Sequence, residues 1–135
     1  MRVIIKSVRR YAASFTVLLA ALSGCAGPSA SGTYQSSASY DRLYAASLSA
    51  VSQVGYTVTS SNKADGLIVA QQGVIMGHGS TAGLNATVSD AGNTRILRVD
   101  FAAPPATLAL GNFDENVAQY VSAVRSRVPD VRAYP

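Results

Sequence analysis

Cys25 is the single thiol of this 135-residue chain, and a thiolate is both a nucleophile and a metal ligand. Because the thiol is single, the sequence excludes an internal disulfide framework and any metal site built from paired Cys-x-x-Cys motifs. The chain is 48% hydrophobic and only 13% charged, which argues against a disordered, self-repelling protein and favours one folded domain. What the sulfur of Cys25 can do therefore depends on the segments around it.

The segment before Cys25 carries the whole excess of positive charge. Four of the eleven basic residues lie in the first ten positions, with no acidic residue among them: Arg2, Lys6, Arg9 and Arg10. From Cys25 onward, seven basic residues face all seven acidic residues, so this part has no formal net charge. The net charge of +4 is therefore a property of one end and does not indicate a nucleic-acid partner.

A run of mostly apolar residues, Tyr11 to Leu22, follows the basic segment. As a helix this run would span about 18 Å, which is short of the ~30 Å hydrocarbon core that a transmembrane helix crosses. A basic segment followed by a short apolar run is the anatomy of a secretory signal peptide. A permanent transmembrane anchor and a buried Cys in an N-terminal helix are the alternatives, and they fit this anatomy less well.

Leu22-Ser23-Gly24-Cys25 resembles the lipobox of bacterial lipoproteins, in which an aliphatic and two small residues precede an invariant Cys. The resemblance implies that the sulfur of Cys25 carries a diacylglycerol, that lipoprotein signal peptidase cleaves before it, and that the new α-amine is acylated. Several acyl chains make membrane attachment durable, since each buried CH₂ contributes about 0.8 kcal/mol. Ala26 and Gly27 follow the Cys where an Asp would imply inner-membrane retention, so the resemblance implies the outer membrane.

The segment from Ala26 to Ser39 is rich in Ser, Gly and Ala, carries no charge and shows no helical or strand periodicity. Such a composition is typical of a flexible tether, with a reach of roughly 20 Å. The sequence therefore predicts a signal peptide over residues 1–24 that is removed, a lipidated Cys and tether over 25–39, and a single domain over 40–135.

The only His of the chain, His78, lies in the sequence Gly77-His78-Gly79 within a glycine-rich bend. A dinucleotide site would need a helix N-terminus directly after the glycines, whereas a strand-like alternation follows them. A catalytic triad would need an orienting acid, and a metal site would need further ligands, and the sequence specifies neither. Gly77, His78 and Gly79 are kept as a candidate ligand-contact loop, with an exposed loop as the alternative.

Two further polar groups have simpler interpretations. Ser60-Ser61-Asn62-Lys63 has the Ser-x-x-Lys spacing of penicillin-recognising enzymes, but it falls in a predicted hairpin turn instead of a helix. Arg125, Arg127 and Arg132 could face an anionic lipid or glycan, although basic residues near a helix C-terminus also suit the helix dipole. We predict no catalytic residue, no metal and no cofactor.

The folded part begins with a predicted helix and a hairpin. Apolar residues recur at spacings of three and four from Tyr40 to Val54, which predicts a helix packed on one face and ended by Gly55. Residues 56–60 and 67–70 are strand-like, and the segment from Asn62 to Gly66 between them has turn chemistry.

A second hairpin and a second helix complete the domain. Residues 84–89 and 95–101 alternate on either side of a predicted turn at 90–93, and Asn112 three residues before Glu115 marks a helix start. That helix has the clearest apolar stripe of the chain: Phe113, Val117, Tyr120, Val121, Val124 and Val128. The order α-β-β-β-β-α predicts an α+β fold, with an antiparallel sheet covered on one face by two helices and preceded by the signal peptide and tether.

Within this domain, Val54-Gly55-Tyr56-Thr57-Val58 and Gly66-Leu67-Ile68-Val69-Ala70 resemble the helix-grip domains of the lipoprotein C subunit of the outer-membrane barrel assembly machinery. Several small bacterial lipoproteins share this cadence. The resemblance covers about thirty residues and implies a fold, not a partner, because that subunit has two such domains and a long partner-binding segment.

The sequence thus predicts an exported, lipid-anchored envelope protein that faces the periplasm from the outer membrane. Its domain would be a non-enzymatic binding or assembly-accessory module, attached to the membrane through acylated Cys25 and contacting an envelope protein but no nucleic acid. The main alternative is a small-ligand or glycan-binding domain whose site is the groove between helix and sheet. A small hydrolase that uses His78 is a third hypothesis.

Overall fold

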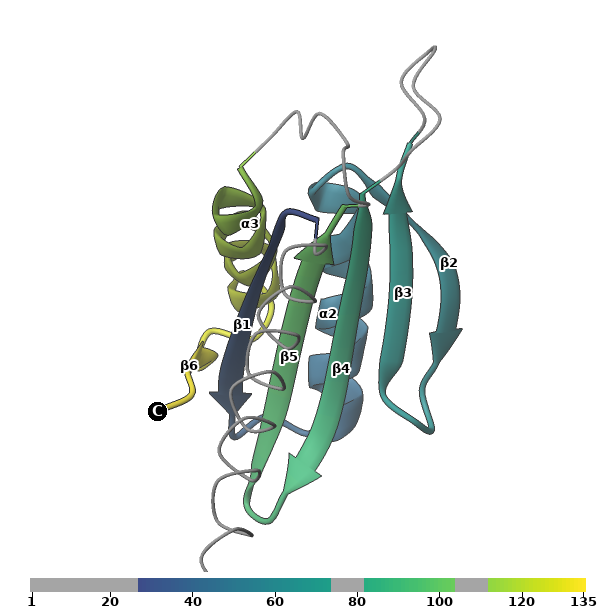
Figure 1. Cartoon of the computed structure of the whole chain (residues 1–135). Coiled ribbons are helices and arrows are strands. Elements are labelled where there is room, and N and C mark those ends of the chain that lie inside the picture. The colour runs from purple at the N-terminus through teal and green to yellow at the C-terminus, as the bar shows by residue number, and fades with distance from the viewer. Residues whose placement is uncertain (1–26, 74–81, 104–111) are drawn as a thin grey trace, which may run out of the picture.

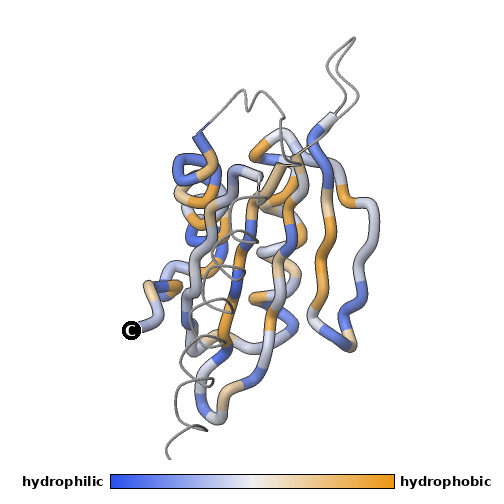
Figure 2. Tube along the Cα trace, in the orientation of Figure 1, coloured by the Kyte–Doolittle hydropathy of each residue, from blue (hydrophilic) through white to orange (hydrophobic). Residues whose placement is uncertain are grey.

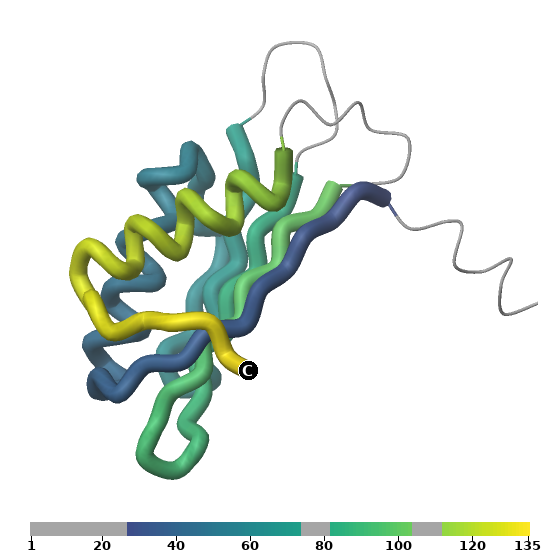
Figure 3. The backbone as a smooth tube through the Cα atoms, turned by 90° about the vertical axis from the view of Figure 1, so that its left-hand side faces the viewer, coloured from purple at the N-terminus to yellow at the C-terminus, as the bar shows by residue number. Residues whose placement is uncertain are grey.

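Two helices pack on one face of a six-stranded antiparallel sheet in the computed structural model, which describes residues 27–73, 82–103 and 112–135 (Figures 1 and 3). The strands lie in the order β2-β3-β4-β5-β1-β6. The elements are β1 (Ser29–Ser36), α2 (Tyr40–Gln53), β2 (Tyr56–Asn62), β3 (Leu67–Gln72), β4 (Gly83–Ala91), β5 (Thr94–Ala102), α3 (Phe113–Arg125) and β6 (Arg132–Ala133). The predicted α+β class, both helices and both hairpins are confirmed, and the sheet has two strands more than expected.

The strand β1 corrects the prediction that residues 26–39 form a flexible tether. It pairs with β5 along its whole length, from Ser29 opposite Ala102 to Ser36 opposite Arg95. The pairing begins one residue earlier, since the Ala103 amide donates a hydrogen bond of 3.0 Å to the carbonyl of Pro28. The two-residue strand β6, also unexpected, pairs with the other edge of β1.

The composition of β1 explains why its sequence pattern resembles a tether. Its inner face carries small residues and one aromatic, Ala30, Gly32 and Tyr34, opposite buried residues of β5. A Cβ at Gly32 would lie 2.7 Å from the Tyr34 ring, so this ring covers the glycine and supplies the apolar surface that Gly32 lacks. The neighbouring strand, not the intrinsic preference of these residues, makes the segment extended.

Both helices start where the sequence predicts. Ser39 caps α2, with its side chain accepting from the Arg42 amide, and Gly55 follows the helix at φ 80°. Asn112 caps α3, with Oδ1 accepting from the Asp114 amide at 3.0 Å. The two helices contact each other, and α2 packs over β2, β4 and β5 while α3 packs over β1 and β5.

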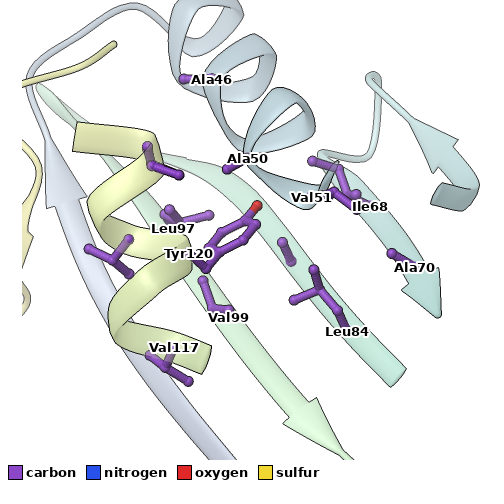
Figure 4. Close-up of a cluster of buried hydrophobic side chains, with 14 of the residues drawn as sticks. Ala46, Ala50, Val51, Ile68, Ala70, Leu84, Leu97, Val99, Val117 and Tyr120 are labelled. Atoms are coloured by element: carbon purple, nitrogen blue, oxygen red, sulfur yellow. The ribbon is translucent and has the colours of Figure 1, made fainter. Parts of the chain in front are cut away.

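The core lies between these helices and the inner face of the sheet (Figure 4). Tyr120 and Phe101 are its largest fully buried side chains, and their rings meet edge to face with 6.3 Å between centroids. Phe101 makes a second edge-to-face contact with Tyr56 at 5.3 Å. Along β5 the hydropathy alternates from residue to residue, as expected for a strand with one buried and one wet face (Figure 2).

The connections between strands and helices gather at two ends of the domain, called the loop end and the hairpin end. At the loop end lie the start of β1, the end of β3, the start of β4, the end of β5 and the start of α3 (Figure 1). At the hairpin end lie the β2–β3 and β4–β5 turns, the residues that join β1 to α2, and the C-terminus of α3. Because β1 starts at the loop end, the whole strand runs from there toward the hairpin end.

Gly66 shows why the β2–β3 turn needs a glycine. It has φ 68°, and its carbonyl accepts a 2.8 Å hydrogen bond from the Val88 amide of β4. A Cβ there would lie 1.9 Å from the Val88 carbonyl oxygen and 2.7 Å from the Tyr40 hydroxyl. The glycine therefore permits both a left-handed backbone and a close approach to β4.

Gly66→Ala and Gly92→Ala form a matched pair that tests this packing. Gly92 has the same φ of 68°, but no atom of the described residues lies within 4 Å of where its Cβ would be. Gly92→Ala should cost about 1 kcal/mol, the left-handed backbone penalty alone, and Gly66→Ala at least ~2 kcal/mol more, because β4 must move away. Equal losses in urea unfolding of the two variants would contradict the close approach.

Tyr120→Phe and Tyr56→Phe each remove a buried hydroxyl, one with a hydrogen-bond partner and one without a partner among the described residues. The Tyr120 hydroxyl donates to the Ser47 carbonyl at 2.6 Å, whereas the Tyr56 hydroxyl is buried with no hydrogen-bond partner among the described residues. Tyr120→Phe should lower the free energy of unfolding by about 1 kcal/mol and Tyr56→Phe should change it by less than ~0.5 kcal/mol or raise it. A loss at Tyr56→Phe as large as at Tyr120→Phe, measured by urea unfolding, would show that Tyr56 is satisfied.

Candidate functional site

The residues that the sequence singled out for lipidation and for ligand contact are not among those described. Cys25 and the loop residues Gly77, His78 and Gly79 all lie outside the described residues. The structure does describe the residues that soon follow Cys25 in the chain. Ser29, the first residue of β1, comes four positions after Cys25. The site predicted for the lipid is thus next to a strand of the sheet.

The Ser-x-x-Lys sequence lies in β2 and the following turn, as predicted, and not in a helix. Ser60 and Ser61 belong to β2, and the Lys63 side chain pairs with Asp41 at 3.0 Å. The Lys63 carbonyl accepts a hydrogen bond from the Tyr40 hydroxyl at 2.6 Å. These contacts hold the turn against α2, which is a structural role.

The three C-terminal arginines lie at the hairpin end, and two of them take part in hydrogen bonds that hold the fold together. Arg125 Nε donates to the Val131 carbonyl at 2.8 Å and so ties the end of the chain to α3. The Arg127 carbonyl accepts from Arg42 Nη2 at 2.9 Å, which joins the C-terminus of α3 to the start of α2. Arg132 is exposed in β6.

The space between helices and sheet, which the alternative hypothesis assigned to a ligand, is filled with side chains in the described part of the chain. Leu43, Phe101 and Tyr120 have no exposed surface, and Leu97 and Val99 have at most 1%. The Tyr120 ring projects from α3 across this space toward α2 (Figure 4). Nothing in this packing favours a ligand-binding groove between helix and sheet.

The most organised polar group in the structure is a clamp at the far end of β1, formed by Ser36, Ser37 and Asp130. Ser36 Oγ donates to Asp130 Oδ1 at 2.6 Å, and the Ser37 amide and hydroxyl donate to Oδ2 at 2.8 and 2.5 Å. These hydrogen bonds, that from Ser36 foremost, lower the pKa of the Asp130 carboxyl to about 2. The Asp130 clamp thus joins β1 to the segment after α3, across 94 residues of sequence.

A small hollow of about 150 Å³ lies beside the clamp and is lined by Gln35, Thr94 and Arg132 as well as by its three members. Sequence reasoning missed the clamp because serines in a Ser-rich segment and one Asp after a helix are individually unremarkable. The available signal was the turn chemistry of Val-Pro-Asp at residues 128–130, which indicates a fixed bend.

The outer face of the sheet, which neither helix covers, is mostly polar, with Leu67 and Ile96 among its apolar residues. Cross-strand pairs on this face match Thr87 with Arg98 and Asn85 with Asp100. Arg98 Nε donates to Asp100 Oδ2 at 3.1 Å along the strand, and Thr33 of β1 lies opposite Arg98. Such a face offers hydrogen-bonding groups to solvent.

The described residues supply little for enzymatic chemistry. Within them, no three His, Cys, Asp or Glu side chains gather where they could hold a metal ion. A shallow hollow between the end of α2 and the outer side of α3 is lined by Gln53, Glu115, Gln119 and Ser122 among others, so its single ionisable side chain is the Glu115 carboxylate. None of the described helices is long and apolar enough to span a bilayer.

Comparisons with known proteins give likenesses of fold only. No protein-family model matches the chain, and no curated protein matches it. Among solved structures, TTHA0849 from Thermus thermophilus is 11% identical with a TM-score of 0.44, covering 76% of this chain and 97% of that chain. Protein CV1439 from Chromobacterium violaceum is 12% identical with a TM-score of 0.45, covering 74% and 96%. Ara h 8.0201 is 8% identical with a TM-score of 0.41, covering 74% and 93%.

The Asp130 clamp predicts a pH-dependent stability. Because folding lowers the pKa of Asp130 from 3.8 to about 2, its contribution is complete above pH ~4 and is lost as the pH falls through ~2. Asp130→Asn should therefore destabilise the protein at pH 7, by about 1 kcal/mol or less because the carboxylate is exposed, and the difference should vanish near pH 2. Urea unfolding at pH 7, 4 and 2.5 measures this.

Asp65→Asn is the control for this prediction, since Asp65 is an exposed carboxylate in the β2–β3 turn with a side-chain partner, Asn62. It removes one negative charge without touching β1. Asp130→Asn in a Ser36→Ala, Ser37→Ala background should cost less than in the native chain. A full, unchanged cost in that background would mean that the clamp is not the source of the effect.

Proposed function

We propose that this protein is a lipid-anchored protein of the bacterial cell envelope, attached through acylated Cys25. Its α+β domain serves as a non-enzymatic binding or assembly-accessory module that faces the periplasm, from the outer membrane given Ala26 and Gly27 after the Cys. The observation that carries the proposal is the order of segments at the N-terminus. A basic stretch, a short apolar run and Leu22-Ser23-Gly24-Cys25 lead into a folded domain that begins directly afterwards.

The charge distribution of the mature chain supports this role. Once residues 1–24 are removed, the remainder carries equal numbers of basic and acidic residues, which suits an exported protein held at a membrane by lipid and not by charge. Lipid anchoring is also consistent with the single Cys being located before the domain and not in its core.

The proposal of a binding module rests on how the described polar side chains are used. Lys63 pairs with Asp41 and Arg95 with Asp90 at 2.9 Å, and Asp130 holds β1. These groups stabilise turns and strand ends, and the outer sheet face presents neutral and charged hydrogen-bonding groups to solvent. Such a surface suits contact with another macromolecule better than chemistry on a small substrate.

Cys25→Ala tests the anchor in a Gram-negative host grown with an alkynyl fatty acid. The native chain should incorporate the fatty acid and sediment with membranes, and Cys25→Ala should do neither and should accumulate as the unprocessed precursor. Ser31→Ala, an exposed change beyond the lipobox, is the matched control and should behave as the native chain. Labelling of Cys25→Ala, or its normal membrane partitioning and processing, would refute lipidation at this residue.

The binding role has its own measurement. Crosslinking of the acylated protein in intact envelopes, followed by mass spectrometry, should yield a reproducible adduct with an envelope protein that the Cys25→Ala variant fails to form. Absence of any reproducible adduct, together with no phenotype on deletion of the protein, would contradict an assembly-accessory role while leaving the lipid anchor in place.

A further inference from the structure

We infer that the domain stands end-on at the membrane, with its loop end against the bilayer surface and its hairpin end directed away from it. This inference rests on the proposed lipid anchor at Cys25, and it adds which surface of the domain the lipid faces. The partner of the loop end is thus the headgroup layer of the membrane to which the protein is attached.

The number of residues between Cys25 and β1 limits how far the start of the domain can lie from the lipid. Pro28 is already fixed, because its carbonyl accepts the hydrogen bond from the Ala103 amide, and β1 pairing starts at Ser29. Only Ala26 and Gly27 separate Cys25 from Pro28. Four residues span at most about 14 Å when fully extended, so Ser29 must lie within that distance of the acylated residue. A tether of fourteen residues, as the sequence suggested, would have allowed any orientation.

The direction in which β1 runs through the sheet determines which end of the domain lies near the lipid. The strand enters the sheet at the loop end and runs to the hairpin end, where the Asp130 clamp fixes its last residue (Figure 3). It is hydrogen-bonded to β5 throughout and to β6 near its end, so the domain cannot swing about β1 without breaking the sheet. A nine-residue strand such as β5 is about 30 Å long, which is the distance by which the hairpin end is farther from the lipid.

The charges of the described residues are divided along the same axis. Near the loop end the start of α3 carries two acidic side chains, Asp114 and Glu115. The Arg98–Asp100 ion pair lies at the middle of β5 and just beyond it toward that end. Six basic residues lie at the hairpin end: Arg42, Lys63, Arg95, Arg125, Arg127 and Arg132. Four acidic residues accompany them: Asp41, Asp65, Asp90 and Asp130.

Because of this division, the end of the domain nearest the proposed anchor is not the end whose basic side chains an anionic membrane would attract. Basic side chains would be drawn to an anionic bilayer if the domain were free to turn, because each contributes about 1 kcal/mol near such a surface. The short spacer instead keeps the basic residues outward, roughly three Debye lengths from the lipid at physiological salt. The hairpin end and the outer sheet face then remain available to a partner in the periplasm.

Lipid-headgroup quenching of two site-specific labels tests the orientation. The full-length acylated protein is extracted from membranes and reconstituted into vesicles of phosphatidylethanolamine and phosphatidylglycerol with a nitroxide on the headgroups. Gly73→Cys places a fluorescent label at the loop end and Asn93→Cys places it in the β4–β5 turn; both positions are exposed. We expect at least about threefold stronger quenching at position 73, since about 30 Å of strand separates the two positions.

A spacer variant is the matched control. Insertion of about twenty Gly and Ser residues between Ala26 and Gly27 lets the domain turn, so quenching at the two positions should converge. Equal quenching with the native spacing, or stronger quenching at position 93, would overturn the orientation. A difference that persists after the insertion would overturn the role of the short spacer in setting the orientation, because the loop end would then bind lipid without its help.

The same samples distinguish this inference from the anchor on which it depends. The intact mass of each preparation reports the acyl chains on Cys25 before any quenching is measured. Protein without acyl chains means that the proposed anchor is wrong. Protein that is acylated and bound to vesicles, but shows equal quenching at both positions, means that only the orientation is wrong.

Discussion

The pairing of β1 with β5 is the constraint on which the rest of the structure depends. It converts a segment with hardly any apolar surface into the penultimate strand of the sheet, paired with β5 along one edge and with the two-residue β6 over a short part of the other. It also supplies part of the surface on which α3 packs, because this helix lies over β1 and β5 and inserts Tyr120 into the core. Without β1 the sheet would end at β5, and one side of α3 would lie over solvent.

Two long-range contacts keep this strand in place at its end. The Asp130 clamp holds Ser36 and Ser37, and β6 pairs with Tyr34 and a neighbour. Both contacts come from the last residues of the chain, so the two ends of the domain stabilise each other. In a protein attached through its N-terminal segment, a force on β1 would be transmitted through these contacts to the rest of the sheet and to the C-terminal residues.

The sequence was sufficient for the elements with strong periodicity and insufficient for those formed by pairing. The stripe of α3, its cap Asn112 and the two hairpins were predictable because each depends on residues close in sequence. Residues 29–36 were misassigned since Ala30 and Gly32 acquire their strand conformation from β5, almost seventy residues later. The clamp shares this origin: no local pattern predicts that Asp130 meets Ser36.

This correction changes what an anchor at Cys25 would mean physically. A long tether makes a domain a freely moving ligand near a surface, whose effective concentration is set by the length of its chain. A spacer of three residues before Ser29 would instead hold the start of β1 within a short distance of that surface. The equal numbers of basic and acidic residues from Cys25 onward would then matter less than their arrangement, because in the proposed orientation the acidic start of α3 faces the lipid and the basic residues of the hairpin end face away from it. In the proposed orientation the outer sheet face and the hairpin end would be open to a macromolecular partner, and contact with such a partner requires no deep pocket.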